Sequence, residues 1–330
     1  MTELTSVVIA SLVHKLKGTP FYAEVAKMHE SRKAAEDFAN KGGFVAPMTI
    51  LLLDWPHDEW YTANTEDISG IDTEGTFGER NQPVVITLHG GTDGNGLLTP
   101  SVLETALTPN PTGNGYAGLN SIGTVRLAQA YQGKSPLKDL LEGHMPDGSS
   151  VPVIGYDTLV ANGKPVYGVK RWAVVRSLDQ AKKTKNGSHT LAELAKMSDG
   201  KIVQATDSQV IVYNGGVAEA TAFLQRLHSA GKVKKVPVYN PFNDSSFNAQ
   251  EDQARVAYLD TPDRYGLYGD GNVNSYSRFV GVGAGGAVAF EQAGQRILEA
   301  YVADALGSGN AFHHKGMIWS GSKAPNLRLE

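Results

Sequence analysis

The segment SQVIVYNGGVAEATAFLQRLHSAGKVKKVPVY, residues 208–239, gives the clearest indication of the fold class. Residues 208–213 are rich in Val and Ile, which favour a strand. Residues 217–230 carry Ala, Phe and Leu at helical spacing, and residues 236–239 return to an extended pattern. A strand, a helix and a strand of these lengths predict a βαβ-like unit, and therefore a mixed α/β protein.

Further strands and helices are expected on both sides of this unit. Residues 57–82 are polar and predict a loop, whereas residues 151–175 predict a hairpin that turns at Asn162-Gly163. The other expected strands are at 45–53, 83–88, 254–259, 265–268 and 278–282. The other expected helices are two within residues 2–41, separated at residues 18–20, and those at 100–107, 124–131, 135–141, 189–197 and 291–306.

The composition bounds the function. A chain of 330 residues predicts two domains, or one large domain with insertions. Only 19% of its residues are charged, so its surface is suited to burial against neighbours. The net charge is −4 and no long basic run occurs, which argues against a dedicated nucleic-acid binder. The absence of cysteine excludes disulfides, zinc–thiolate sites and cysteine nucleophiles, and no apolar run is long enough to predict a membrane span.

The segment His89-Gly90-Gly91-Thr92-Asp93, which follows the expected strand 83–88, is the first candidate for chemistry. It resembles the His-Gly-Gly oxyanion loop of esterases and, more distantly, the His-Gly-Thr-Asp-Thr loop of asparaginases. The partner motifs of these families, Gly-x-Ser-x-Gly and Thr-Gly-Gly-Thr, do not occur in the chain. An α/β hydrolase or amidohydrolase acting near His89 and Asp93 is therefore an alternative hypothesis, beside the simpler interpretation of a glycine turn that closes a strand.

Two other segments carry weaker signals. Residues 281–286, GVGAGG, match the spacing of the dinucleotide fingerprint, but too little chain follows for the second half of the binding unit. The cluster Asp54, His57, Asp58 and Glu59, extended by residues 313–314, contains metal-ligand side chains without a compact ligand spacing. We therefore expect neither a cofactor nor a metal.

Residues 189–318 contain a series of segments whose order resembles a known family. The segments are HTLAELAKM (189–197), SQVIVYNGG (208–216), VAEATAFLQRLHSAGK (217–232), VPVYNPF (236–242), ARVAYLDTPDRYGLYGD (254–270) and ILEAYVADALGSGNAF (297–312). In this order they resemble the distal half of the major capsid protein of tailed bacteriophages, whose fold is shared with encapsulin nanocompartments. That family carries a long spine helix in its middle, whereas residues 96–150 here predict only short helices broken by Gly and Pro.

The resemblance implies an α+β (mixed α/β), tailed-phage capsid-like fold with an N-terminal arm, an extended loop and two α/β lobes. Its implied divisions are residues 1–42 as a helical N-terminal arm, 43–180 as extended loop and first lobe, 181–265 as an axial-type α/β lobe, and 266–330 as a C-terminal return to the first lobe. The implied function is a structural, self-assembling shell subunit rather than an enzyme.

The implied partners are copies of the chain itself, other virion proteins, and enclosed nucleic acid or cargo held without sequence-specific contact; no membrane partner is expected. The implied location is a virion assembled in the host cytoplasm, or the cytoplasm for a nanocompartment. Aromatic side chains are the expected anchors of such interfaces, although each could belong to the core instead. The candidates are Tyr265, Tyr268, Tyr276, Phe279, Phe290 and Trp319.

Overall fold

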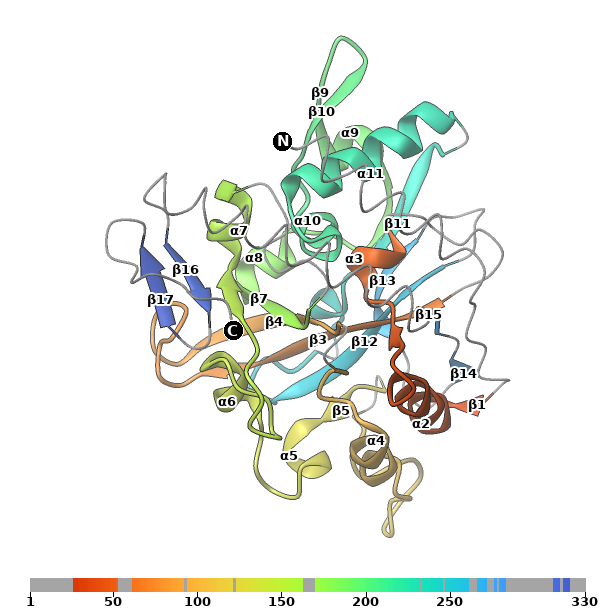
Figure 1. Ribbon diagram of the computed structural model, residues 1–330, viewed down its shortest axis with the longest axis vertical. Helices are drawn as coiled ribbons and strands as arrows, with labels where there is room; N and C mark the ends of the chain where they lie inside the picture. Colours follow the sequence, from red (N-terminus) through yellow and green to blue (C-terminus); the bar gives the residue numbers. More distant parts are fainter. Residues whose placement is uncertain are drawn as a thin grey trace.

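A large mixed sheet forms the centre of the protein in the computed structural model (Figure 1). The structure describes residues 26–52, 61–91, 94–120, 123–162, 170–231, 233–245, 247–260, 266–271, 276–277, 279–282, 311–314 and 317–320. Within this part of the chain the sheet has nine strands in the order β6-β7-β4-β3-β12-β13-β11-β8, and β5 also pairs with β12. The pairs β6–β7 and β11–β13 are parallel, and the other pairs are antiparallel. The strands are β3 (Tyr61–Asp72), β4 (Gln82–His89), β5 (Val125–Arg126), β6 (Val153–Gly155), β7 (Trp172–Ser177), β8 (Gly187–Thr190), β11 (Lys235–Tyr239), β12 (Gln253–Leu259) and β13 (Leu267–Gly271).

Helices cover both faces of this sheet. Because side chains alternate along a strand, Ile68 of β3 and Val256 of β12 face one layer, whereas Ala63 and Ala257 face the other. The first layer holds α2 (Met28–Ala39), α4 (Pro100–Ala106), α5 (Leu127–Ala130) and α6 (Leu137–Leu141). The second layer holds α3 (Met48–Leu51), α9 (Leu191–Leu194), α10 (Ser208–Asn214) and α11 (Val217–Ala230). The remaining helices are α7 (Tyr156–Asn162), α8 (Leu178–Lys182) and the 3-10 turn η1 (Pro241–Asn243).

Four two-stranded sheets complete the described structure. Two of them join early and late parts of the chain, because β1 (Ala26–Lys27) pairs with β14 (Tyr276–Ser277) and β2 (Phe44–Val45) pairs with β15 (Gly281–Val282). The hairpin of β9 (Ala195–Ser198) and β10 (Lys201–Ala205) projects beyond the body, at the top of Figure 1. The last pair is β16 (Ala311–His314) with β17 (Met317–Ser320).

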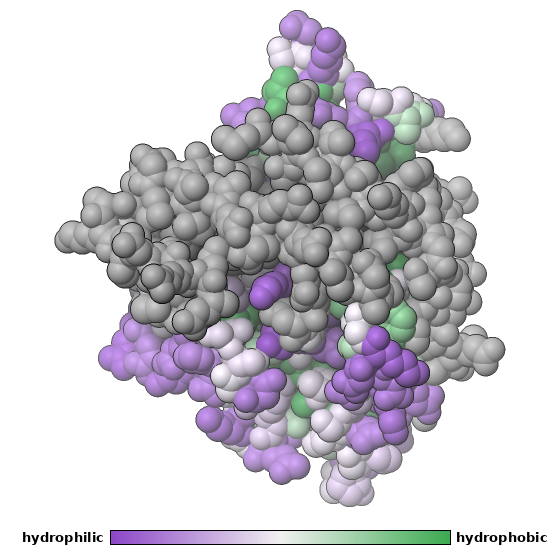
Figure 2. Space-filling model, viewed as in Figure 1, coloured by the Kyte–Doolittle hydropathy of each residue, from purple (hydrophilic) through white to green (hydrophobic). Residues whose placement is uncertain are grey.

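The surface that Figure 2 shows for the described residues is mainly polar. Figure 2 shows hydrophilic residues along the lower margin of the molecule, with apolar residues visible only in small spots between them. The large apolar side chains that the described residues expose are Met197 and Val203, both on the projecting β9–β10 hairpin. None of the described helices is both long and apolar enough to cross a membrane.

The central strand β3 was predicted as a polar loop, and this prediction is wrong. Eleven of its twelve residues are buried, although the strand contains Thr62, Asn64, Thr65, Glu66 and Asp67. Strands β4 and β12 satisfy the backbone on its two sides, and partners from distant segments satisfy side chains such as Glu66 and Asp67. Polarity alone therefore gives the wrong assignment when most polar groups of a segment find partners in the folded protein.

The prediction of a βαβ-like unit at 208–239 is also wrong, because residues 208–214 form the helix α10 and not a strand. The Asp207 carboxylate accepts hydrogen bonds from the backbone N–H groups of Gln209 and Val210, which fixes the start of the helix. Gly215 ends it in the left-handed region at φ 82°. The strand expected at 45–53 is likewise replaced, in its described part, by β2 and the short helix α3.

The hairpin expected at 151–175 is not formed either. Strands β6 and β7 are parallel, and the helix α7 lies between them in the chain. The strands predicted at 83–88 and 254–259 are confirmed as β4 and β12. The helices predicted at 100–107 and 217–230 are confirmed as α4 and α11. The helix expected at 291–306 and the first 25 residues of the N-terminal arm lie outside the described residues.

The capsid-like architecture is not found. The helices described between residues 96 and 150 are α4, α5 and α6, which have 7, 4 and 5 residues, so no spine helix lies there. The longest described helix is α11 with 14 residues, and it lies elsewhere. The mixed α/β class itself is confirmed by the large mixed sheet with helices on both faces.

Candidate functional site

A buried carboxyl on the central strand organises the polar groups on one face of the sheet. Asp67 of β3 is 2% exposed. Its Oδ1 accepts a hydrogen bond from Thr87 Oγ1 at 2.6 Å, and its Oδ2 accepts from Tyr213 Oη at 2.6 Å and from Gln209 Nε2 at 3.2 Å. Burial, and then the neighbouring Asp67, raise the pKa of the Tyr213 hydroxyl well above its usual range, so Tyr213 stays protonated and donates.

A buried arginine is joined to this carboxyl through a hydroxyl. Arg176 of β7 is 1% exposed and donates from Nη2 to Thr87 Oγ1 at 3.3 Å and from Nη1 to Ser208 Oγ at 3.5 Å. Because Thr87 accepts from Arg176 and donates to Asp67, it connects a positive group with a negative one. Strands β3, β4 and β7 and the helix α10 therefore meet in one polar network, in which the Nε of Arg176 and the Oε1 of Gln209 have no hydrogen-bond partner among the described residues.

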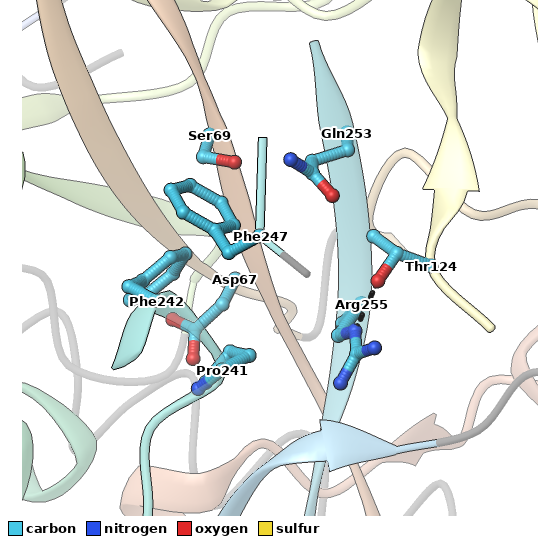
Figure 3. A pocket seen from close by; sticks show the side chains of 8 residues that line it. All are labelled: Asp67, Ser69, Thr124, Pro241, Phe242, Phe247, Gln253 and Arg255. Carbon is cyan, nitrogen blue, oxygen red and sulfur yellow. Dashed lines mark hydrogen bonds between the residues drawn. The ribbon is translucent and has the colours of Figure 1, made fainter. Parts of the chain in front are cut away.

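A pocket opens beside this network (Figure 3). The space inside it is about 10 Å³, which is enough for one water-sized group, and its mouth opens to solvent. The polar lining comes from two neighbouring strands and one adjacent loop: Asp67 and Ser69 from β3, Gln253 and Arg255 from β12, and Thr124 just before β5. In Figure 3 the Asp67 and Arg255 side chains approach the same space from adjacent strands.

Most polar groups of the pocket are bonded to the protein. Gln253 accepts from Asn120 Nδ2 at 3.0 Å through Oε1 and donates from Nε2 to the Asn248 carbonyl at 2.8 Å. The Nε of Arg255 donates to Thr124 Oγ1, the dashed line in Figure 3.

Ser69 is different from these groups. It is 2% exposed, and its Oγ has no hydrogen-bond partner among the described residues. A buried hydroxyl without a partner costs about 1–3 kcal/mol. The pocket therefore contains one buried polar atom that the described protein does not satisfy.

The remaining wall of the pocket is apolar. Pro241 and Phe242 belong to η1, and Phe247 follows it in the loop before β12. The two phenyl rings meet edge to face, with centroids 5.4 Å apart. Asn240 fixes the turn, because its side chain accepts from Phe242 N and donates to the carbonyls of residues 181 and 184. The ammonium of Lys182 lies 5.8 Å from the Phe247 ring centroid and brings a positive charge close to this wall.

The structure places His89, the histidine of the alternative catalytic pair, in the core. Its ring stacks on Trp172 at 4.9 Å, and its two nitrogens bond to Thr65 Oγ1 and the Val212 carbonyl, each at 3.1 Å. Burial lowers the pKa of His89 to about 3, and nearby Arg176 acts in the same direction. Neither nitrogen is left for a substrate, and Asp93 lies outside the described residues.

The aromatic residues that were expected to anchor interfaces differ in how deeply they are buried. Phe279 is fully buried beneath the guanidinium of Arg32, 5.1 Å from the ring centroid, so it is a core residue and not an exposed anchor. Tyr268 is partly exposed and stacks on Tyr258 at 4.9 Å and Tyr239 at 6.5 Å. The other candidates cannot be placed: Tyr265 and Phe290 lie outside the described residues, as do the side chains of Tyr276 and Trp319.

The other candidate sites receive no support. Within the residues that the structure describes, no group of three or more His, Asp or Glu side chains could hold a metal. The cluster at residues 54–59 and the glycines at 283–286 lie outside the described part, and residues 281–282 form the strand β15.

None of the polar pocket residues was singled out in the sequence. The signal that could have found one of them is Arg255, a charged residue inside the otherwise apolar run 254–259. Ser69 and Asp67 gave no such signal, because they lie in the strand that was predicted as a loop.

These features define the protein as a mixed α/β chain with a large mixed sheet and one buried polar network beside a pocket. No family model matches the chain, and no curated protein matches it in sequence. A solved structure described as "Accommodation of massive sequence variation in Nanoarchaeota by the C-type lectin fold" is similar to it. The TM-score is 0.49 and the identity 15%, over 80% of this chain and 98% of that chain.

The resemblance to phage capsid and encapsulin shells is therefore wrong. The helices described between residues 96 and 150 are all short, so the spine helix of the capsid family is not among them, and the fold named for the similar solved structure is a C-type lectin fold, not a capsid fold. No finding supports a capsid protein or a location in a virion. That the chain binds copies of itself stays a prediction.

Proposed function

We propose that this protein binds small polar ligands, and that the pocket between β3, β12 and η1 receives one polar group of the ligand. The observation that carries the proposal is the Ser69 hydroxyl, which is buried, lines the pocket and has no partner among the described residues. Native proteins satisfy nearly all buried polar groups, so a group left open at a cavity favours a ligand that completes it.

The rigidity of the site supports binding. Its polar floor belongs to the two central strands of the sheet, and the Asp67 network holds β3 against β4 and α10. Groups held on such a frame lose little conformational freedom when a ligand arrives.

Binding is favoured over catalysis by the chemistry of the described residues. A serine nucleophile needs a base within hydrogen-bond reach, and no described side chain bonds to Ser69. The buried histidine that the sequence suggested, His89, uses both ring nitrogens on Thr65 and Val212. The described residues therefore give a hydrolase acting near His89 no free base.

The test is a thermal-shift screen of the full chain against small polar molecules that include anions, cations and neutral compounds. We expect at least one class to raise the Tm, since a ligand that binds only the folded state stabilises it. The rise should shrink in Ser69→Ala and stay unchanged in Ser198→Ala, a control on the exposed β9–β10 hairpin. If no compound raises the Tm, the proposal fails.

A further inference from the structure

We infer that Asn114 is a site of spontaneous chemical modification, at which its side chain reacts with the backbone nitrogen of Gly115 and the asparagine becomes aspartate or isoaspartate. The inference does not depend on the proposed binding function, because neither residue lines the pocket. Both residues lie in the loop between α4 and β5.

The reaction uses only the chain and water. The backbone nitrogen of Gly115 attacks Cγ of Asn114 and forms a C–N bond, while the N–H proton and the side-chain NH2 leave together as ammonia. One water molecule then opens the cyclic imide at either of its two carbonyls, which gives aspartate or isoaspartate and adds one negative charge. Glycine favours the attack, because it has no Cβ to obstruct the ring or to restrict the backbone.

The sequence offers this reaction at several places, and the structure separates them. The chain has five Asn-Gly pairs, at residues 95–96, 114–115, 162–163, 186–187 and 214–215. The pair at 162–163 is set aside, because Gly163 lies outside the described residues. The other four share the same two reacting residues, so the difference between them must come from the fold.

The pair at 114–115 is the most open of the four. Both residues are exposed, in a loop that reaches the bottom of Figure 1 below α4. Apart from its neighbours in the chain, no atom lies within 4 Å of the place that a Cβ on Gly115 would take. Among the described residues, neither the Asn114 side chain nor the Gly115 N–H has a hydrogen-bond partner. Nothing in this part of the chain therefore holds the two reacting groups apart.

The pair at 214–215 is held in place at the end of α10. Asn214 is 5% exposed, and its Nδ2 donates to the Val210 carbonyl at 2.8 Å. The Gly215 N–H, which would have to attack, donates to the Val212 carbonyl at 3.1 Å. Both reacting groups are therefore bonded elsewhere, and the helix end must open before they can meet.

The pair at 95–96 is packed against the buried ion pair. Gly96 is buried, and a Cβ there would lie 2.3 Å from the Glu66 carboxylate. The backbone carbonyl of Asn95 accepts from Arg171 Nη1 at 3.0 Å. The chain at this point therefore has no room to close a ring without displacing a buried charge.

The pair at 186–187 is exposed but engaged. The Oδ1 of Asn186 accepts from the Asn240 backbone N–H at 2.7 Å, and Gly187 belongs to β8, where it pairs with Val238. This pair should react more slowly than 114–115, because a side-chain contact and a strand pairing must both be released first.

The experiment incubates the full chain at pH 8.5 and quantifies each Asn-Gly peptide by mass spectrometry. Conversion adds about 1 Da, and fragmentation distinguishes isoaspartate from aspartate. We expect residue 114 to convert at least about tenfold faster than residues 95 and 214, because those two react only after local opening. The rate at residue 114 should rise with pH, since the attacking nitrogen must lose its proton.

Two controls show whether the fold or the sequence decides. In urea all four pairs become accessible, so their rates should become similar. Asn114→Gln should abolish the main acidic species on isoelectric focusing, because its longer side chain would have to close a larger ring. Asn40→Gln, at another exposed asparagine that precedes Lys41, should leave this species unchanged.

Three results would overturn the inference. One is a rate at residue 114 no greater than those at residues 95 and 214 in the folded chain. Another is a set of relative rates that is the same in the folded and the urea-unfolded chain, and the third is aspartate without isoaspartate, since the imide gives both. None of these results bears on the binding function, which the thermal-shift screen decides.

Discussion

Replacement of His89 by Gln should change how the stability of the protein depends on pH. The ring of His89 is fully buried, and burial lowers its pKa from 6.5 to about 3. In the unfolded chain the imidazole is exposed and takes up a proton near pH 6.5. The unfolded state therefore binds more protons than the folded state between these two values, and stability is lost as the pH falls from about 6.5 toward 3.

The size of the effect follows from the two pKa values. One unit of pH between them costs about 1.4 kcal/mol, so His89 should remove about 2 kcal/mol of unfolding free energy between pH 7.5 and pH 5. Gln carries no titrating group, so His89→Gln should lose about 2 kcal/mol less than the wild type over this interval. At pH 7.5 the variant should be less stable, because it loses the stacking on Trp172.

Urea unfolding at pH 7.5, 6.5, 5.5 and 5.0, at one ionic strength, measures this difference directly. Acidic groups common to both proteins cancel in the comparison. The variant His228→Gln is the control, because His228 is exposed at the end of α11 and should leave the wild-type pH dependence intact. The reasoning is refuted if His89→Gln and wild type lose the same stability between pH 7.5 and pH 5.

Three further substitutions test the interior. Glu66→Gln should lower the free energy of unfolding in urea by about 3–5 kcal/mol, because it leaves the Arg32 charge buried without its partner. Glu66 and Arg32 form an ion pair at 3.2 Å with both side chains fully buried. The control Glu104→Gln, at an exposed position, should have almost no effect. Gly96→Ala should lower the free energy of unfolding by about 1–3 kcal/mol, since a Cβ there would lie 2.3 Å from the Glu66 carboxylate. An unchanged urea midpoint would contradict this packing. Asp207→Ala should cost about 0.5–2 kcal/mol through the loss of the α10 cap, and a stability equal to wild type would show that the cap contributes little.

The parts of the fold that the sequence predicted are those whose signals are local. The strand β4 is an apolar run, and α11 carries its buried residues on one helical face: Val217, Ala220, Phe223, Leu224 and Leu227. The helix α4 begins at Pro100 after the capping residue Thr99. Such signals depend only on neighbours in the chain, so they persist whatever the rest of the protein does.

The parts that were missed depend on distant partners. All seven residues of α10 are buried, so the helix has no solvent-exposed face to give the sequence a helical pattern, and its β-branched side chains indicated a strand. In β3 the Glu66 carboxylate accepts from the backbone N–H groups of Leu97 and Leu98, more than 30 positions away. The pocket was missed for the same reason, because Ser69 and Arg255 become neighbours only when β3 and β12 pair.

The pairing of β3 with β12 has a consequence for how the protein is made. On the ribosome, β3 and β4 are complete long before β12 has been synthesised, and for that interval one edge of the central strand has no ladder partner. Contacts of such sequence separation form slowly, and exposed strand edges in incomplete chains promote aggregation. A nascent polypeptide that stops before residue 253 would therefore have an open sheet edge, and we expect such fragments to need chaperones or to be degraded.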